Sequence, residues 1–196
     1  MERVWLESLL SLGVGLGLAA AVGLRVFLPL LLLGSAARFG WIPLADGFEW
    51  LASGAGLSAL GIATVLEIGA YYIPLVDNLL DLVAGPSAVM AGILATAAVT
   101  TDLPPAVRWA AAIIAGGGTA GTIQSLTTVA RLKSSALTGG LGNPVLATLE
   151  WIVSLGASLV AIVFPAVAIL FVVGAIMLAR WMTRRFFPRV PVARTS

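Results

Sequence analysis

Five long apolar segments constrain the fold of this chain more than any other feature. They cover residues 9–33, 51–73, 86–100, 106–130 and 145–181. A helix of about 20 apolar residues crosses the roughly 30 Å hydrocarbon core of a bilayer. With 60% hydrophobic and 10% charged residues, the chain has too few polar residues to cover a soluble domain of this length. We therefore expect a single membrane domain over residues 1–196, with an all-α polytopic fold of about five transmembrane helices.

The lengths of the segments predict irregularities in some of these helices. The third segment is short for a crossing and could begin earlier, near Leu79. The fifth is too long for a straight crossing and contains Pro165, so we expect a kink, a strong tilt, a cytoplasmic extension or a hairpin of two crossings. Glycine, proline and asparagine predict loops at residues 40–43, 74–78, 101–105 and 138–144.

Two stretches of the chain, 101 positions apart, are similar in sequence: Phe48-Glu-Trp-Leu-Ala-Ser53 and Leu149-Glu-Trp-Ile-Val-Ser154. The same offset pairs Pro43 with Pro144, which favours an internal duplication. We expect one repeat over about residues 9–101 and an incomplete second one over about residues 106–182. Three crossings in the first repeat would make the second inverted, so that residues 15–68 superpose on residues 116–169. Trp50 and Trp151 would then lie at opposite membrane interfaces.

The basic residues predict the orientation. Five arginines occupy the C-terminal region: Arg180, Arg184, Arg185, Arg189 and Arg194. Cytoplasmic ends of membrane proteins carry such an excess, so we expect a basic cytoplasmic tail over residues 183–196, beside lipid headgroups rather than nucleic acid. With five crossings the N-terminus lies outside, and we expect no cleaved signal peptide. The expected location is the bacterial inner membrane.

The chain contains no cysteine and no histidine, and this excludes several kinds of chemistry. Disulfides, thiolate metal sites, imidazole proton relays and Ser-His-Asp or Cys-His catalysis all require one of these residues. The glycine runs at residues 13–17 and 116–121 are not followed by the Lys-Ser/Thr of a phosphate loop. We expect no enzyme activity, no metal and no cofactor.

Polar residues inside the apolar segments mark a candidate solute site, because a charge facing hydrocarbon is costly. On straight helices rising 1.5 Å per residue, Arg25 lies about 24 Å from the outer end of the first segment and Glu67 about 24 Å from the inner end of the second. Arg25 and Glu67 are therefore expected in opposite halves of the membrane. Gln124 reaches nearly the depth of Glu67, so we expect these two side chains to lie close together. The candidate solute or ion ligands in this outer vestibule are Glu67, Gln124, Thr127, Thr128, Asp77, Asn78 and Arg131, with Asp81 nearby, and Arg25 is the candidate inner gate or counter-charge.

Structural interpretations of these residues stay open. Glu67 or Arg25 could pair with a neighbour to hold helices together, and Asp77 could cap a helix. Glu49 and Glu150 precede tryptophans at matched helix starts, where a carboxylate suits the helix dipole and an indole suits the interface. The two glycine runs indicate either close helix packing or helices broken near residues 23–25 and 124–125.

Several motifs resemble one known family. They are residues 17–34, residues 36–41, Glu67 with Ile73-Pro-Leu-Val-Asp-Asn78, and Gly139-Gly-Leu-Gly-Asn-Pro144 with Glu150. Together they resemble the bacterial and plastid membrane family known as domain of unknown function 4126, from about Leu9 to Arg180. The resemblance implies an all-helical membrane fold and no settled activity.

The residues themselves predict a membrane channel or gradient-driven secondary transporter for a small polar or charged solute. The expected partners are the lipid bilayer and a second copy of the chain in a homodimer. The alternative is a non-transporting scaffold, lipid-interacting or assembly protein, in which all buried polar groups pair internally. The two hypotheses differ in whether Glu67 and Gln124 border a hydrated cavity or form sealed hydrogen bonds.

Overall fold

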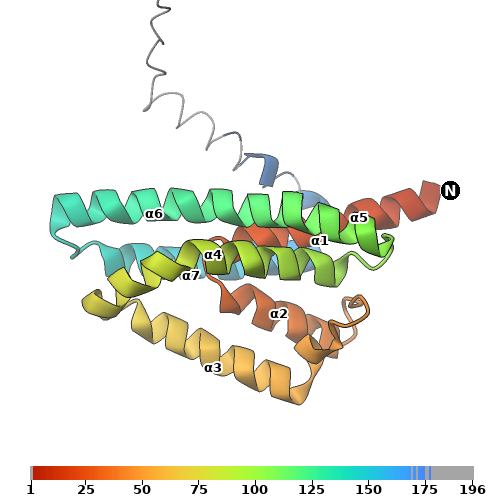
Figure 1. Ribbon diagram of the computed structural model, residues 1–196, viewed down its shortest axis with the longest axis horizontal. Coiled ribbons are helices and arrows are strands. Elements are labelled where there is room, and N and C mark those ends of the chain that lie inside the picture. Colours follow the sequence, from red (N-terminus) through yellow and green to blue (C-terminus); the bar gives the residue numbers. More distant parts are fainter. Residues whose placement is uncertain (1, 169, 171, 175–176, 178–196) are drawn as a thin grey trace, which may run out of the picture.

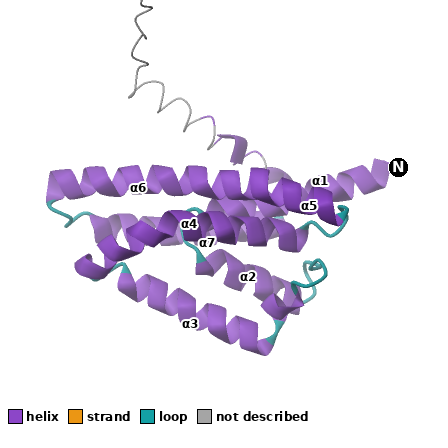
Figure 2. Ribbon diagram, in the orientation of Figure 1, coloured by secondary structure: helices purple, strands orange, loops and turns teal. Residues whose placement is uncertain are grey.

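The computed structural model describes residues 2–168, 170, 172–174 and 177, and within these residues the fold is all helical (Figure 1). Short loops join the helices, as Figure 2 shows. The elements in chain order are α1 (Glu2–Val22), α2 (Phe27–Arg38), the 3-10 helix η1 (Glu49–Ala52), α3 (Gly54–Ala70), α4 (Pro74–Val99), α5 (Pro105–Ala111), the π-helix η2 (Ala112–Gly117), α6 (Gly118–Thr138) and α7 (Asn143–Val163).

The helices lie side by side and define two ends of the molecule (Figure 1). We call one the turn end, because it holds the tight turns at residues 71–73 and 139–142. The other is the loop end, with the start of α1 and the loops at residues 39–48 and 100–104. A cavity of about 410 Å³ at the loop end is lined by Glu7, Trp41 and Asp102 among others. The N-terminal part of α1 therefore lies beside both loops.

The first apolar segment was expected to cross the bundle once. Instead, the chain reverses between α1 and α2 (Figure 1). In α2, the backbone of Phe27 contacts Glu67 and the side chain of Arg38 contacts Ala52, so α2 runs antiparallel to α3. Gly15 of α1 packs on Thr96 near the end of α4, so α1 enters from the loop end. The segment thus forms a helical hairpin that enters and leaves at the same end.

Close helix packing in the bundle depends on small residues. A Cβ added to Gly15 would lie 3.0 Å from Thr96 Cγ2, and one added to Gly116 would lie 2.7 Å from the carbonyl oxygen of Gly92. The hydroxyl of Thr96 donates to the carbonyl of Gly15 at 3.1 Å. Both glycine runs therefore pack helices closely, as one interpretation of the sequence held, and the break near residues 23–25 that the other interpretation held is present between α1 and α2.

The fifth segment is interrupted just before Pro165. Helix α7 ends at Val163 and the chain becomes helical again at Pro165. Ala161 and Ala168 both pack against Gly17 of α1, so the described residues after Pro165 turn back along the bundle. Of the irregularities expected for the fifth segment, the hairpin agrees with these contacts. The expected basic tail, residues 183–196, lies outside the described residues.

The turn between α3 and α4 differs from the expectation. Pro74 is the first residue of α4 rather than part of a loop, because a proline at the first helical position loses no intrahelical hydrogen bond. The third segment therefore becomes helical well before Leu79. Residues 77 and 78, expected in a loop, belong to the first turns of α4.

Among the described residues, one helix is both long enough and apolar enough to cross a membrane. It is α7, Asn143–Val163. The other apolar helices, including Leu6–Val22, Phe27–Arg38 and Gly54–Ala70, are shorter.

Candidate functional site

The candidate site forms around the reversal between α1 and α2, at residues 23–26. The local sequence explains the break: Gly23 follows the last residue of α1, and Pro29, which lacks an N–H, fits only the first turn of a new helix. The N–H groups of Gly23 and Arg25 still donate to α1 carbonyls, those of Ala19 and Ala21, at 3.0 Å. The next N–H groups belong to α2 and need a new acceptor.

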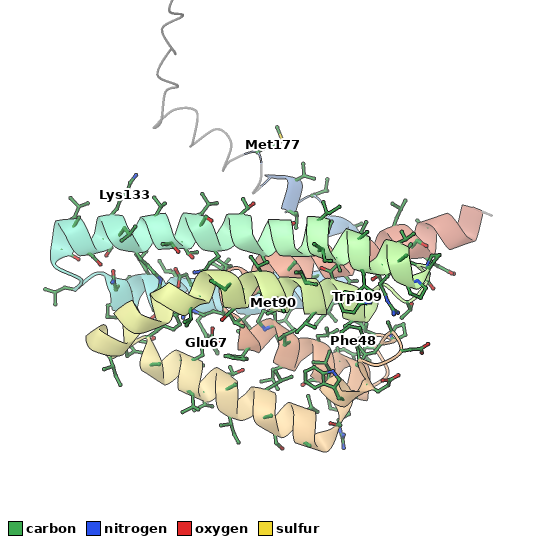
Figure 3. All side chains as sticks on the ribbon, in the orientation of Figure 1. Phe48, Glu67, Met90, Trp109, Lys133 and Met177 are labelled. Carbon is green, nitrogen blue, oxygen red and sulfur yellow. The ribbon has the colours of Figure 1, made fainter. Side chains whose placement is uncertain are left out.

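Glu67 supplies that acceptor. The N–H of Val26 donates to Glu67 Oε1 at 2.8 Å, and the N–H of Phe27 donates to Oε2 at 3.2 Å. Glu67 lies in the last turn of α3 and is buried, on the side of α3 that faces the other helices (Figure 3). A carboxylate at this place satisfies the free N–H groups of α2 and interacts favourably with the positive end of its dipole. Glu67 therefore holds the N-terminus of α2.

Arg25, in the reversal itself, binds α7. Its Nη2 donates to Glu150 Oε2 and to the carbonyl oxygen of Ala147, both at 2.9 Å. Arg131 of α6 binds the same carboxylate, with Nε 3.2 Å from Oε1 and Nη2 in contact with Oε2. One carboxylate thus joins two guanidinium groups, and all three residues are buried. We call Arg25, Arg131 and Glu150 the arginine cluster.

The ring of Tyr71 covers the arginine cluster. The Arg25 guanidinium carbon lies 3.9 Å from the ring centroid, and that of Arg131 lies 4.4 Å from it. A cation over an aromatic face is attracted by the ring quadrupole, more strongly where water is excluded. Tyr71 therefore offsets part of the repulsion between two positive groups that share one carboxylate.

A cavity of about 290 Å³ adjoins the cluster between α3 and α7. Arg25 lines it together with Tyr71, Tyr72 and Trp151, among others. Two of the lining residues also carry buried N–H groups without a hydrogen-bond partner, Nε and Nη1 of Arg25 and Nε1 of Trp151. The hydroxyls of Tyr72 and Thr148, two of the lining residues, form a hydrogen bond at 2.8 Å.

The expected contact between Glu67 and Gln124 is wrong. Helices α3 and α6 do not touch, and the amide nitrogen of Gln124 instead donates to Thr128 at 3.5 Å. The hydroxyls of Thr127 and Thr128 both donate to the carbonyl oxygen of Gln124, at 2.9 Å. These residues satisfy their own helix, which runs unbroken through the place where a break near residue 124 was one possibility.

The other predicted residues are distributed differently. Arg131, expected as a vestibule charge, is instead buried in the arginine cluster, where it meets Arg25, expected in the opposite half of the membrane. The reversal explains the position of Arg25, because its depth was calculated for a straight first helix. Asp77, Asn78 and Asp81 lie in the first two turns of α4, and their side chains lie outside the described part of the structure.

Sequence reasoning missed two members of the site, Glu150 and Tyr71. Glu150 was interpreted through its match to Glu49, yet Glu49 is exposed and Glu150 is buried. A charge count gives a signal that could have found it: two arginines in apolar surroundings need carboxylates, and Glu150 is available within an apolar segment. Within the described residues, no three potential metal ligands among Asp, Glu, His and Cys cluster together.

Comparison with known proteins gives one match. The family described as "Domain of unknown function (DUF4126)" matches residues 12–185, which include the whole of the candidate site. No curated protein and no solved structure matches the chain.

Proposed function

The chain belongs to the DUF4126 family, and we propose that it is a polytopic membrane protein that moves a small polar or charged solute, as a channel or gradient-driven secondary transporter. One observation carries this proposal: the first apolar segment reverses inside the bundle, with the buried charges Arg25 and Glu67 at the reversal. Discontinuous helices in transporters place charges and free backbone groups at the depth where solute binds. Irregular backbone at membrane depth also requires surrounding protein or a water-filled cavity.

The distribution of side chains supports a membrane environment. Buried positions hold many alanines and several polar side chains, such as Ser154 and Ser158, while large apolar side chains point outward. Ile114 is 76% exposed and Leu66 is 66% exposed. In water this arrangement would be unfavourable, whereas in lipid small residues pack helices and large apolar residues face the acyl chains.

The inverted repeat is part of this proposal. Trp50 lies in η1 at the loop end and Trp151 in the half of α7 nearer the turn end, so the matched tryptophans lie in opposite halves of the bundle. The break at residues 23–26 is not repeated 101 positions later, where α6 is continuous. The homodimer, the inner-membrane location and a cytoplasmic C-terminus stay predictions.

The scaffold hypothesis is the second candidate, and a specific observation favours it. Glu67 and Glu150 each have hydrogen-bond partners within the protein, as a purely structural role would require. The two hypotheses therefore differ in whether the charge of Glu67 is needed for something besides holding α2.

A flux assay on a charge-removing variant separates them. The purified protein is reconstituted in liposomes and tested with a panel of small anions, cations and neutral polar solutes. Glu67→Gln keeps the side-chain volume and one acceptor oxygen but removes the charge. Glu49→Gln is the matched control, since Glu49 is exposed and accepts a hydrogen bond from the nearby N–H of Gly47. Thermal unfolding is measured on the same samples.

Transport predicts flux of at least one solute by the wild-type protein and the Glu49→Gln control, with flux abolished or strongly changed in Glu67→Gln. A wild-type protein that moves nothing across the panel, combined with a clear loss of stability in Glu67→Gln, would contradict transport and support the scaffold hypothesis.

A further inference from the structure

The cavity between α3 and α7 has a buried inner part and an exposed rim. Among the residues that line it, Arg25, Tyr71 and Ala147 are buried, whereas Tyr72 and Thr148 are exposed. The remaining lining residues are half-buried. The cavity therefore extends from the interior of the bundle to a rim that Tyr72 and Thr148 form.

Helices α3 and α7, on either side of this cavity, do not pack on each other. Both are described over their whole length, and no Cα atom of α3 lies within 8 Å of one of α7. Helix α3 instead lies along α2 (Figure 1). The space between α3 and α7 is therefore closed by side chains and not by backbone.

One hydrogen bond joins the two sides of the rim, and we call it the rim bridge. The hydroxyls of Tyr72 and Thr148 lie 2.8 Å apart, a usual distance for such a bond. The Thr148 hydroxyl donates its hydrogen to the carbonyl oxygen of Pro144, at 2.8 Å. A hydroxyl has one hydrogen, so Tyr72 is the donor in the rim bridge and Thr148 the acceptor.

The rim bridge can open without movement of the turn that carries Tyr72. The neighbouring Tyr71 is buried, and its ring centroid lies 3.9 Å from the guanidinium carbon of Arg25. This contact holds the turn from the inside. Exposed side chains change rotamer within nanoseconds, and one hydrogen bond changes an equilibrium by a factor of only about 2 to 10. Rotation of the Tyr72 side chain therefore suffices to open the rim.

We propose that Tyr72 and Thr148 form a gate over this cavity, closed by the rim bridge and opened by rotation of the Tyr72 side chain. The gate controls the access of small solutes to the inner part of the cavity, which Arg25 lines. This inference rests on the proposed function for the role of the gate, because a protein that moves a solute has to admit it to the buried charges. Opening itself is measured without flux.

A single cysteine inside the cavity reports opening, since the chain has no cysteine of its own. Ala147→Cys serves as the reporter, because Ala147 lines the cavity and is 2% exposed. The purified full-length protein in detergent is treated with methyl methanethiosulfonate, a small thiol reagent, and the rate of modification is followed by mass spectrometry of the intact protein. If thermal unfolding shows that Ala147→Cys is not folded, Ile68→Cys on the opposite wall replaces it.

A second reporter distinguishes opening of the gate from opening of the whole bundle. Ser154→Cys is a conservative change on the same helix, at a buried position that does not line the cavity. Its hydroxyl donates to the carbonyl oxygen of Ala21 on α1, within the packed bundle. A cysteine there is modified when the bundle opens and not when Tyr72 rotates.

Three variants test the rim bridge. Tyr72→Phe removes the donor and keeps the ring, and Thr148→Val removes the acceptor at similar volume. Thr122→Val is the matched control for Thr148→Val. The hydroxyl of Thr122 likewise donates to a carbonyl of its own helix, that of Gly118, but Thr122 lies on α6 and does not line the cavity.

The gate predicts that Tyr72→Phe and Thr148→Val each accelerate modification at position 147 by about threefold, within the range expected for one hydrogen bond. Thr122→Val should leave this rate unchanged, and none of the variants should change the rate at position 154. The proposal is overturned by an unchanged rate at position 147 in Tyr72→Phe or Thr148→Val, by an equal increase in Thr122→Val, or by an equal increase at position 154.

The liposome flux assay on the same variants separates the gate from the proposed function. Faster modification at position 147 without flux of any solute by the wild-type protein would contradict transport alone. Flux by the wild-type protein, combined with no effect of Tyr72→Phe and Thr148→Val on modification, would contradict the gate alone.

Discussion

Glu67 and Glu150 are both buried carboxylates beside the α1–α2 reversal, and the protein uses them in different ways. Glu67 accepts two hydrogen bonds from neutral backbone N–H groups, whereas Glu150 binds two guanidinium groups. Loss of a partner therefore has different consequences. Without Glu67 the start of α2 loses its acceptor, and without Glu150 two positive charges remain buried together.

The difference indicates which carboxylate is free to serve another purpose. Glu150 balances the charge of the guanidinium groups of Arg25 and Arg131, so its substitution disturbs the arginine cluster itself. Glu67 could be replaced by a neutral acceptor without leaving a buried charge unpaired in the arginine cluster. A functional requirement for a negative charge is therefore more readily tested at Glu67 than at Glu150.

The largest effect is expected for Glu150→Gln. Removing one partner of a buried ion pair typically costs about 3–5 kcal/mol, and here two guanidinium groups lose their carboxylate. The free energy of unfolding, measured by denaturation in detergent, should fall by about that amount. Glu49→Gln, at the position matched by the repeat, should change it by less than about 0.5 kcal/mol, as exposed substitutions usually do. Similar small losses in both variants would show that Glu150 does not balance the arginines.

A smaller loss is expected for Glu67→Ala, because it leaves neutral donors without an acceptor. An unsatisfied buried donor costs about 1–3 kcal/mol. Hydrogen exchange should become faster at the amides of Val26 and Phe27 and stay unchanged in α7. The exposed Asp46→Ala serves as the control. Unchanged exchange at both amides would mean that Glu67 does not hold α2.

The smallest of these effects is expected for Tyr71→Leu, which removes the ring over both arginines. Cation–π contacts contribute about 0.5–2 kcal/mol. Thermal unfolding should therefore show a modest loss that Tyr71→Phe largely restores, since phenylalanine keeps the ring face. Tyr72→Leu is the neighbouring control, as Tyr72 is about half exposed. If Tyr71→Leu and Tyr72→Leu have equal effects, the ring does not support the cluster.

The sequence allowed much of the fold to be predicted, because the signals were local. Apolar segments predicted helices, Pro165 predicted the interruption after α7, and the small residues around Gly15 and Gly116 predicted close packing. Each depends on residues near one another in the chain. The family resemblance was confirmed by the match over residues 12–185.

The arrangement of the site was not predictable from the same signals. Residues on both sides of the reversal are apolar, so composition does not change there, and only Gly23 and Pro29 mark the break. Arg25 and Glu150 are separated by 125 positions in the sequence. A straight first helix places Arg25 at a different depth in the membrane from Glu150. The depth of Arg25 was calculated for a helix that crosses once, so its predicted separation from Glu67 was wrong.

Labelling of single introduced cysteines determines whether the first apolar segment turns back inside the bundle, because the chain contains no cysteine of its own. Glu7→Cys, Asp46→Cys and Leu141→Cys each place an exposed cysteine on α1, on the loop after α2 and in the turn before α7. In sealed, uniformly oriented vesicles, a membrane-impermeant maleimide should label positions 7 and 46 from one side and position 141 from the other. Labelling of positions 7 and 46 from opposite sides would show that the segment crosses the membrane once and does not turn back.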